Sequence, residues 1–235
     1  MQLSPTGFDI WLATELGECL NRFPLFDECI QSGIRHYVLG GLWYAAAMFV
    51  FWVQAARRDD GQRRLRIITT IVGSAITILL AFLAGVIFTW PPPIHNPELA
   101  HFFPPYIDQN PNASSFPSMS TALYGSVAAG MYSIHKTTGL FLWVALPLLV
   151  SLPRMYVGGH WFSDIVAGLA FALIGFGLAR YLLETPVLAR LETALASHRS
   201  WVVIADFFVF IWILEVAVEF REAVWLVNAY RILTQ

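Results

Sequence analysis

Long apolar stretches dominate this chain of 235 residues and restrict the folds that it can adopt. Hydrophobic residues make up 57% of the sequence and charged residues 13%, about half the charged fraction of a typical soluble domain. A helix of roughly 20 apolar residues crosses a bilayer because it satisfies its backbone hydrogen bonds internally. Six stretches have this character: 34–54, 67–90, 118–134, 140–156, 161–183 and 201–220. We therefore expect an all-α, polytopic transmembrane helical bundle of about six spans.

The first 33 residues differ from the stretches that follow. Their apolar residues alternate with acidic ones such as Asp9, Glu15 and Glu18, a pattern typical of a helix lying in the membrane interface. We expect three parts: an interfacial segment 1–33, a transmembrane core 34–183, and a cytoplasmic linker with a C-terminal membrane helix in 184–235. That last helix carries Asp206, Glu215 and Glu219, so an interfacial helix is the alternative there.

Basic residues are unevenly distributed among the connections. Segment 91–117 contains no Lys or Arg, whereas the other connections hold Arg57, Arg58, Arg63, Arg64, Arg66, Lys136, Arg180, Arg190 and Arg199. Basic loops stay in the cytoplasm. We therefore expect an inner-membrane or plasma-membrane protein with both termini, segment 91–117 and the turn 154–160 on the non-cytoplasmic side.

Three polar residues lie around the junction of the fourth and fifth stretches: Arg154, His160 and Asp164. If a helix begins near His160, Asp164 lies on the same face and can accept the imidazole N–H, leaving the other ring nitrogen free as a nucleophile. Arg154 can fold back over the Gly158-Gly159 turn with a guanidinium suited to phosphate. Such a group is typical of phosphoryl transfer through a covalent intermediate. A chance grouping at a membrane edge is the alternative.

A second polar segment, Ser114-Ser-Phe-Pro-Ser-Met-Ser-Thr121, precedes the third stretch. Ser114 or Ser115 can cap a helix, and Pro117 suits its first turn. The backbone N–H groups there, with the Ser118 hydroxyl, form a candidate anion cradle. Ordinary helix capping is the alternative.

The motif Phe116-Pro-Ser-Met-Ser120, followed by Arg154-x5-His160-x3-Asp164, resembles the type-2 phosphatidic acid phosphatase (PAP2) superfamily of lipid phosphatases and phosphotransferases. The resemblance covers roughly residues 34–183. It implies a membrane-embedded bundle whose site opens on the outer side and needs no metal or other cofactor. By this resemblance, His160 is the phosphohistidine nucleophile and Asp164 is its orienting carboxylate. Arg154 and Ser118 match phosphate-holding residues, and we add the nearby Ser120 as a further phosphate-binding candidate.

The chain departs from the family pattern at two places. The histidine of the family's second motif is replaced by Ser120, whose hydroxyl cannot act as a general acid near pH 7. The family's first motif, with its Lys and Arg, is absent after Trp90. A diphosphate substrate, whose leaving group needs little protonation, is one solution. Candidate acids in the outer loop are a second solution, and they are His95, His101 and Asp108.

The predicted function is hydrolysis or transfer of a phosphoryl group from a lipid phosphate or diphosphate, for example a polyprenyl diphosphate. The alternative is a catalytically silent relative that serves as a membrane subunit or lipid-binding partner of another membrane protein. A net charge of −2 argues against nucleic acid. His36, His135 and His198 lack ligand spacing, so no metal site is assigned. Cys19 and Cys29 are compatible with a disulfide or with two free thiols.

Overall fold

The computed structural model describes residues 4–20, 22–88, 90–103, 114–183 and 199–220. The described residues form helices joined by turns and loops, so the predicted all-α class is confirmed. In chain order the α-helices are α1 (Gly7–Cys19), α2 (Pro24–Arg35), α3 (Gly41–Arg58), α4 (Gly61–Ile87), α5 (Met119–Ile134), α6 (Lys136–Ala145), α7 (Leu152–Tyr156), α8 (Phe162–Leu183) and α10 (Arg199–Ala217). Two short 3-10 helices, η1 (Pro93–His95) and η2 (Ala100–Phe102), and a π-helical stretch, η3 (Leu146–Ser151), complete them.

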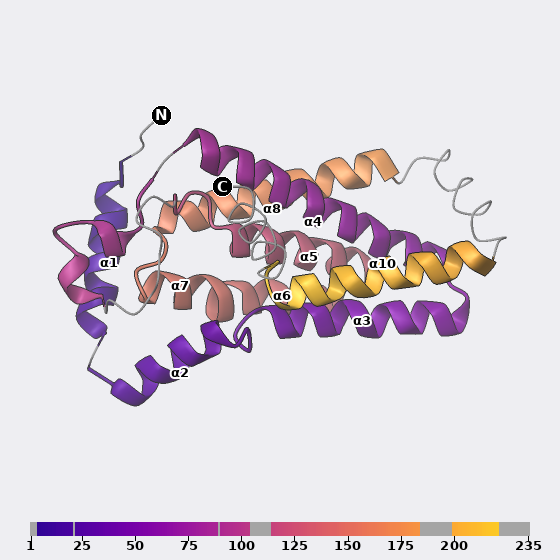
Figure 1. Ribbon diagram of the computed structural model, residues 1–235, viewed down its shortest axis with the longest axis horizontal. Coiled ribbons are helices and arrows are strands. Elements are labelled where there is room, and N and C mark those ends of the chain that lie inside the picture. The colour runs from indigo at the N-terminus through magenta and orange to yellow at the C-terminus, as the bar shows by residue number, and fades with distance from the viewer. Residues whose placement is uncertain (1–3, 21, 89, 104–113, 184–198, 221–235) are drawn as a thin grey trace, which may run out of the picture.

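The centre of the molecule is a bundle in which α4, α5 and α8 pack against one another. Figure 1 shows α3 and α10 running side by side along this bundle, with α1 and α2 at one end of it. The main core consists of apolar side chains from α3, α5, α6 and α10, among them Tyr44, Met48, Tyr124, Val127 and Val216. The end covered by α1 has a second core that includes Trp90, Tyr156 and Trp161.

Within the part of the chain that the structure describes, three helical segments are long and apolar enough to cross a membrane: α4, α8 and the continuous stretch Lys136–Tyr156. They coincide with the second, fourth and fifth predicted stretches. Within Lys136–Tyr156, Pro147 and Pro153 remove two backbone donors, and the helix widens between them into η3. Outward-facing residues of α4, α8 and α10 are large and apolar, as a lipid-facing surface requires.

The first predicted stretch begins too early in the sequence. Residues 34 and 35 belong to α2, and the chain then turns at Tyr37, which has a left-handed φ of 58°. The next helix starts only at Gly41. Asp59 and Asp60 form the turn between α3 and α4. Asp59 ends α3 in a left-handed conformation, and the Asp60 side chain accepts a hydrogen bond from the backbone of Arg63 at the start of α4.

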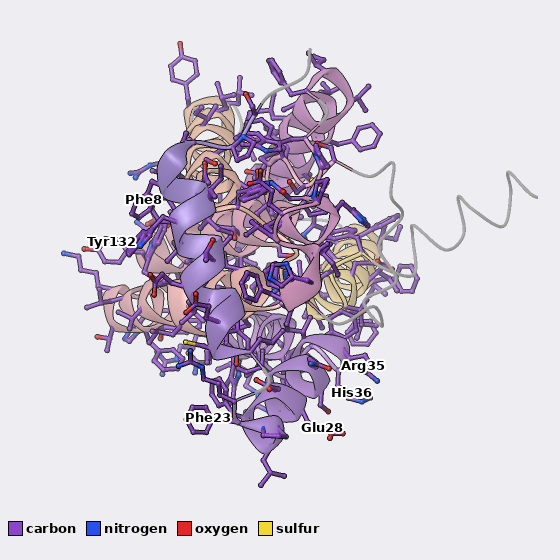
Figure 2. All side chains as sticks on the ribbon, turned by 90° about the vertical axis from the view of Figure 1, so that its left-hand side faces the viewer. Phe8, Phe23, Glu28, Arg35, His36 and Tyr132 are labelled. Atoms are coloured by element: carbon purple, nitrogen blue, oxygen red, sulfur yellow. The ribbon has the colours of Figure 1, made fainter. Side chains whose placement is uncertain are left out.

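The N-terminal helix is anchored by a residue that the sequence placed on a polar face. Asp9 is 1% exposed, and its carboxylate accepts hydrogen bonds from the Ser163 backbone N–H at 2.9 Å and the Ser163 hydroxyl at 2.8 Å. In Figure 2, which views this end of the molecule, α1 crosses in front of the bundle with Phe8 near its start. Because Ser163 lies in the first turn of α8, Asp9 joins α1 to the helix that carries Asp164.

Candidate active site

His160 lies in the turn between α7 and α8. Gly158, with φ of 76°, allows this turn, and the Gly159 N–H closes it by donating to the Arg154 carbonyl oxygen at 2.9 Å. The His160 Nδ1 atom lies 2.9 Å from the carbonyl oxygen of Ser115. A carbonyl oxygen can only accept, so this contact requires Nδ1 to carry the proton. The lone pair then resides on Nε2, the nitrogen that can act as a nucleophile.

Asp164 lies near His160 but has a closer donor. Its Oδ2 atom is 3.5 Å from His160 Nδ1 and 2.8 Å from the backbone N of Trp161. The sequence predicted that the carboxylate would accept a hydrogen bond from the imidazole N–H, whereas the Ser115 carbonyl oxygen is the nearer acceptor. The reason is that Asp164 sits in the first turn of α8, where unpaired backbone N–H groups attract a carboxylate.

The Asp164 carboxylate is also unusually enclosed. The residue is 0% exposed, and its Oδ1 atom has no hydrogen-bond partner among the described groups. Buried carboxylate oxygens are normally paired. The other oxygen, Oδ2, lies 3.5 Å from His160 Nδ1, so the carboxylate is placed to stabilise positive charge on that ring.

The start of α5 differs from the predicted cap. The helix begins at Met119 with Ser118 as N-cap. The Ser114 hydroxyl instead donates to the Phe88 carbonyl oxygen, and the Ser115 hydroxyl donates to that of Trp90. These bonds join the start of α5 to the end of α4, so the prediction that Ser114 or Ser115 caps the helix is wrong.

Ser118 is buried, and its polar groups already have partners. Its hydroxyl donates to Thr121 Oγ1 at 3.0 Å, which lies 3.1 Å from Ser151 Oγ. Its backbone N–H donates to the Asp164 carbonyl oxygen at 3.1 Å. The predicted anion cradle therefore lacks this hydroxyl and this N–H. The N–H ties the start of α5 to α8, and the hydroxyl donates within α5.

Arg154 and Ser120 meet at a residue that sequence reasoning did not single out. The Arg154 guanidinium donates to one carboxylate oxygen of Glu219, and the Ser120 hydroxyl donates to the other at 2.9 Å. A second guanidinium nitrogen of Arg154 donates to the Val150 carbonyl oxygen. Glu219 follows α10, and in the sequence it served only to suggest an interfacial helix. No local pattern links it to Arg154, which lies 65 residues earlier.

The two candidate acids of the outer loop have different surroundings. His95 lies in η1, which is held against the Gly158 turn by a hydrogen bond from the Ile94 N–H to the Gly158 carbonyl oxygen. Its Nε2 atom is buried without a partner among the described groups. His101 is exposed, and its ring lies 3.9 Å from that of Phe102. The third candidate, Asp108, is outside the described residues.

Other predicted features can be placed briefly. Within the described ranges, no group of three or more His, Cys, Asp or Glu side chains could hold a metal ion. Cys19 and Cys29 are free and exposed. A cavity lined by Asp60, Gln62, Arg63, Arg66 and Ile134 lies at the start of α4, the opposite end of that helix from the Ser114 and Ser115 contacts.

Comparison with known proteins supports the family resemblance. Residues 75–187 match the model of the PAP2 superfamily. A Bacillus licheniformis protein named bacitracin transport permease protein BcrC is 27% identical over 132 residues, which is 56% of this chain and 59% of that protein. The chain therefore matches less than two thirds of this relative's length. No solved structure gives a significant match. Residues 75–187 are thus similar to the PAP2 superfamily, and the matched segment contains Ser120, Arg154, His160 and Asp164 but not Glu219.

Proposed function

We propose that this chain, whose residues 75–187 match the PAP2 superfamily, is an integral-membrane phosphatase or phosphotransferase for a lipid phosphate or diphosphate. The observation that carries the proposal is the 2.9 Å contact between His160 Nδ1 and the Ser115 carbonyl oxygen. It orients the ring and leaves Nε2 as the nucleophilic nitrogen. The site faces the non-cytoplasmic side in this proposal, because the basic connections lie at the other end of the bundle.

The reaction proceeds through a phosphohistidine. Nε2 of His160 attacks phosphorus, the bond from phosphorus to the leaving oxygen breaks, and its electron pair stays on that oxygen. The phosphorylated ring becomes cationic while Nδ1 keeps its proton. The buried Asp164 carboxylate, 3.5 Å from Nδ1, stabilises this charge together with the Ser115 carbonyl oxygen. Water or an acceptor hydroxyl then removes the phosphoryl group.

Phosphate binding is assigned to Arg154 and Ser120. A guanidinium offers paired donors that match phosphate oxygens, and Ser120 supplies a hydroxyl from the first turn of α5. Ser118 holds the start of α5 against α8 in this proposal, because its N–H and hydroxyl already have partners. A polyprenyl diphosphate suits the site because a phosphate leaving group needs less protonation than an alkoxide.

A silent membrane subunit is the second candidate, and the Arg154–Glu219 ion pair favours it. The Glu219 carboxylate pairs with the Arg154 guanidinium, which an enzyme would need for binding the substrate phosphate. In this second proposal Arg154 and Glu219 serve to join α7 to the end of α10, and no phosphoryl transfer occurs.

Phosphate release separates the two candidates. Purified protein is offered phosphatidate and a polyprenyl diphosphate, and His160→Ala is compared with wild type. We expect activity to fall about a thousandfold or more, because the nucleophile is lost. His36→Ala is the matched control. His36 is exposed at the end of α2 and points outward in Figure 2, so this variant should retain activity.

Trapping of the intermediate gives a second readout. Acid quenching during turnover of labelled substrate should leave phosphate on the wild-type protein and none on His160→Ala. Equal background release by wild type and His160→Ala on both lipids, with no trapped phosphoprotein, would favour the silent subunit.

A further inference from the structure

The Glu219 carboxylate binds Arg154 and Ser120, the two residues to which phosphate binding is assigned. One carboxylate oxygen accepts a hydrogen bond from the Arg154 guanidinium, and the other accepts one from the Ser120 hydroxyl at 2.9 Å. The Arg154 and Glu219 side chains are only 11% and 20% exposed. A carboxylate with one guanidinium and one hydroxyl on its two oxygens imitates two oxygens of a bound phosphate. Glu219 therefore lies where a substrate phosphoryl group would enter.

The backbone around Glu219 is held in an uncommon conformation. Glu219 and Phe220 have φ of 55° and 57°, a left-handed region that costs about 1–2 kcal/mol for each non-glycine residue. Two hydrogen bonds support this turn: the Phe220 N–H donates to the Glu215 carbonyl oxygen, and the Tyr124 hydroxyl donates to that of Val216. Such strain persists where surrounding contacts maintain it and is frequent at functional sites. Here it directs the carboxylate towards Arg154.

Entry of a phosphate changes the charge balance of this pair. A phosphoryl group and the carboxylate then share one guanidinium in a largely buried place, and two anions at such a distance repel each other. A carboxylate relieves the repulsion by taking up a proton. The neighbouring elements supply the cation Arg154 from α7 and the phenol Tyr124 from α5, and Glu215 lies on α10 itself. The Arg154 guanidinium has no site that accepts a proton, and the Tyr124 hydroxyl donates to the Val216 carbonyl oxygen. The Glu219 carboxylate, whose oxygens face Arg154 and Ser120, is the group here that can accept a proton.

We propose that Glu219 is the proton donor of the phosphoryl-transfer reaction, a role that rests on the proposed function. Binding of the substrate phosphate to Arg154 and Ser120 drives one proton onto the Glu219 carboxylate. When Nε2 of His160 attacks phosphorus, the leaving oxygen keeps the electron pair of the broken bond and takes that proton. Glu219, again a carboxylate, then accepts a proton from the water that attacks the phosphohistidine. When phosphate leaves, Glu219 releases that proton and pairs with Arg154 again.

This assignment supplies an acid where the local sequence has none. The Ser120 hydroxyl cannot protonate a leaving oxygen near neutral pH, but it holds the Glu219 carboxyl 2.9 Å away. The acid thus comes from the end of α10, which is distant from the start of α5 in the sequence but lies next to it in the fold.

Proton uptake on anion binding tests the inference without turnover. Sulfate is the probe because it is the anion of a strong acid and stays a dianion throughout the neutral pH range. Calorimetric titrations in buffers of different ionisation enthalpy report the protons taken up. We expect wild type to take up about one proton more than Glu219→Gln, and its sulfate affinity to rise up to about tenfold per pH unit as the pH falls. Glu219→Gln should bind at least as tightly and with a weaker pH dependence.

Two variants control this titration. Arg154→Gln should lose sulfate binding, because the guanidinium is removed. Glu215→Gln changes a different carboxylate, on α10 and one turn before Glu219. One oxygen of Glu215 has no hydrogen-bond partner among the described groups. This variant should bind sulfate and take up protons as wild type does. Equal proton uptake by wild type and Glu219→Gln, or sulfate binding that does not depend on Arg154, would overturn the inference.

Leaving-group dependence is the second readout. A lipid monophosphate releases an alkoxide, which needs a proton, whereas a diphosphate releases phosphate. We expect Glu219→Gln to lower kcat for phosphatidate by about 10²-fold or more and for a polyprenyl diphosphate by less than about tenfold, with little change in KM.

The outcomes separate this inference from the proposed function. If His160→Ala retains activity, the proposed function fails. If activity depends on His160 but Glu219→Gln affects both lipids equally or neither, only the role of Glu219 fails. A merely structural role for Glu219 would lower activity on both lipids together and would leave the number of protons taken up unchanged.

Discussion

Asp9 illustrates how one buried side chain determines the position of a whole helix. Its carboxylate accepts hydrogen bonds from the backbone and hydroxyl of Ser163 and from the backbone and hydroxyl of Thr6. Burial by itself opposes ionisation, but the hydrogen bonds from Ser163 and Thr6 outweigh it and lower the pKa of Asp9 below its ordinary value of 3.8. The ionised form of Asp9 therefore favours the docked position of α1 on the first turn of α8.

Acidification should release α1 before the rest of the bundle unfolds. Because the pKa of Asp9 is lower in the folded state, its contribution to stability is fully present above the ordinary value near 3.8. That contribution is lost as the pH falls through the lower folded-state value. Hydrogen exchange of residues 7–19 measures this release. Asp9→Asn should raise exchange there at neutral pH, at a cost of about 1.5–3 kcal/mol, and should remove the pH dependence. Protection of residues 7–19 that does not change with pH in wild type would contradict the prediction.

At the scale of the elements, close approach of α4 and α8 depends on small residues. Gly175 of α8 faces Thr77 of α4: a methyl group on Gly175 would lie 2.1 Å from the Thr77 Oγ1 atom and 2.8 Å from its backbone N. Thr77 also donates its hydroxyl to the Phe171 carbonyl oxygen across the same contact. Such small-residue contacts let membrane helices pack backbone against backbone.

Two glycines of α8 form a matched pair for testing this contact. Gly175→Ala should destabilise the bundle by about 1–3 kcal/mol, because the added methyl forces α4 and α8 apart. Gly177→Ala adds the same methyl two residues later, where nothing lies within 4 Å. It should be neutral or stabilise the helix by up to about 1 kcal/mol. Thermal unfolding in detergent compares the two variants, and equal midpoints would show that the α4–α8 contact tolerates a wider spacing.

At the scale of the whole molecule, the two ends of the bundle differ in chemistry. One end carries the arginines of the α3–α4 connection, including Arg63 and Arg66. The other end carries His160, Asp164 and the helices α1 and α2, which dock through Asp9 and through a hydrogen bond from Tyr156 to Asp27. Because basic connections stay in the cytoplasm, we expect the His160 end to face outward.

The two native cysteines provide a direct test of this orientation. Cys19 and Cys29 are free and exposed, and Cys19 lies at the His160 end because its carbonyl oxygen contacts the Tyr156 hydroxyl. A membrane-impermeant maleimide should label both in intact cells. In a variant without native cysteines, Gln62→Cys at the exposed start of α4 should react only after permeabilisation. The reverse pattern would place the site in the cytoplasm.

Local sequence was sufficient for the fold class, and it brought out the candidate residues that lie close together along the chain, but not Glu219. Apolar stretches of spanning length predicted helices over α4, α8 and Lys136–Tyr156, because hydrophobicity and backbone satisfaction in a bilayer are properties of a single segment. The spacing of Arg154, His160 and Asp164 was also visible, because all three lie within one turn and the helix start that follows it. Helix boundaries were less accurate: α3 and α5 begin at Gly41 and Met119 rather than at residues 34 and 118.

The hydrogen-bond partners were decided only by the tertiary structure. His160 bonds to Ser115, Arg154 to Glu219, and Ser163 to Asp9, across 45, 65 and 154 residues. Each donor has several plausible acceptors in the sequence, and the spacing of apolar residues does not indicate which acceptor it will bind. Packing of α1, α5, α8 and α10 brings one acceptor within reach and buries it, and burial makes that pairing necessary, because an unpaired polar group without water is costly.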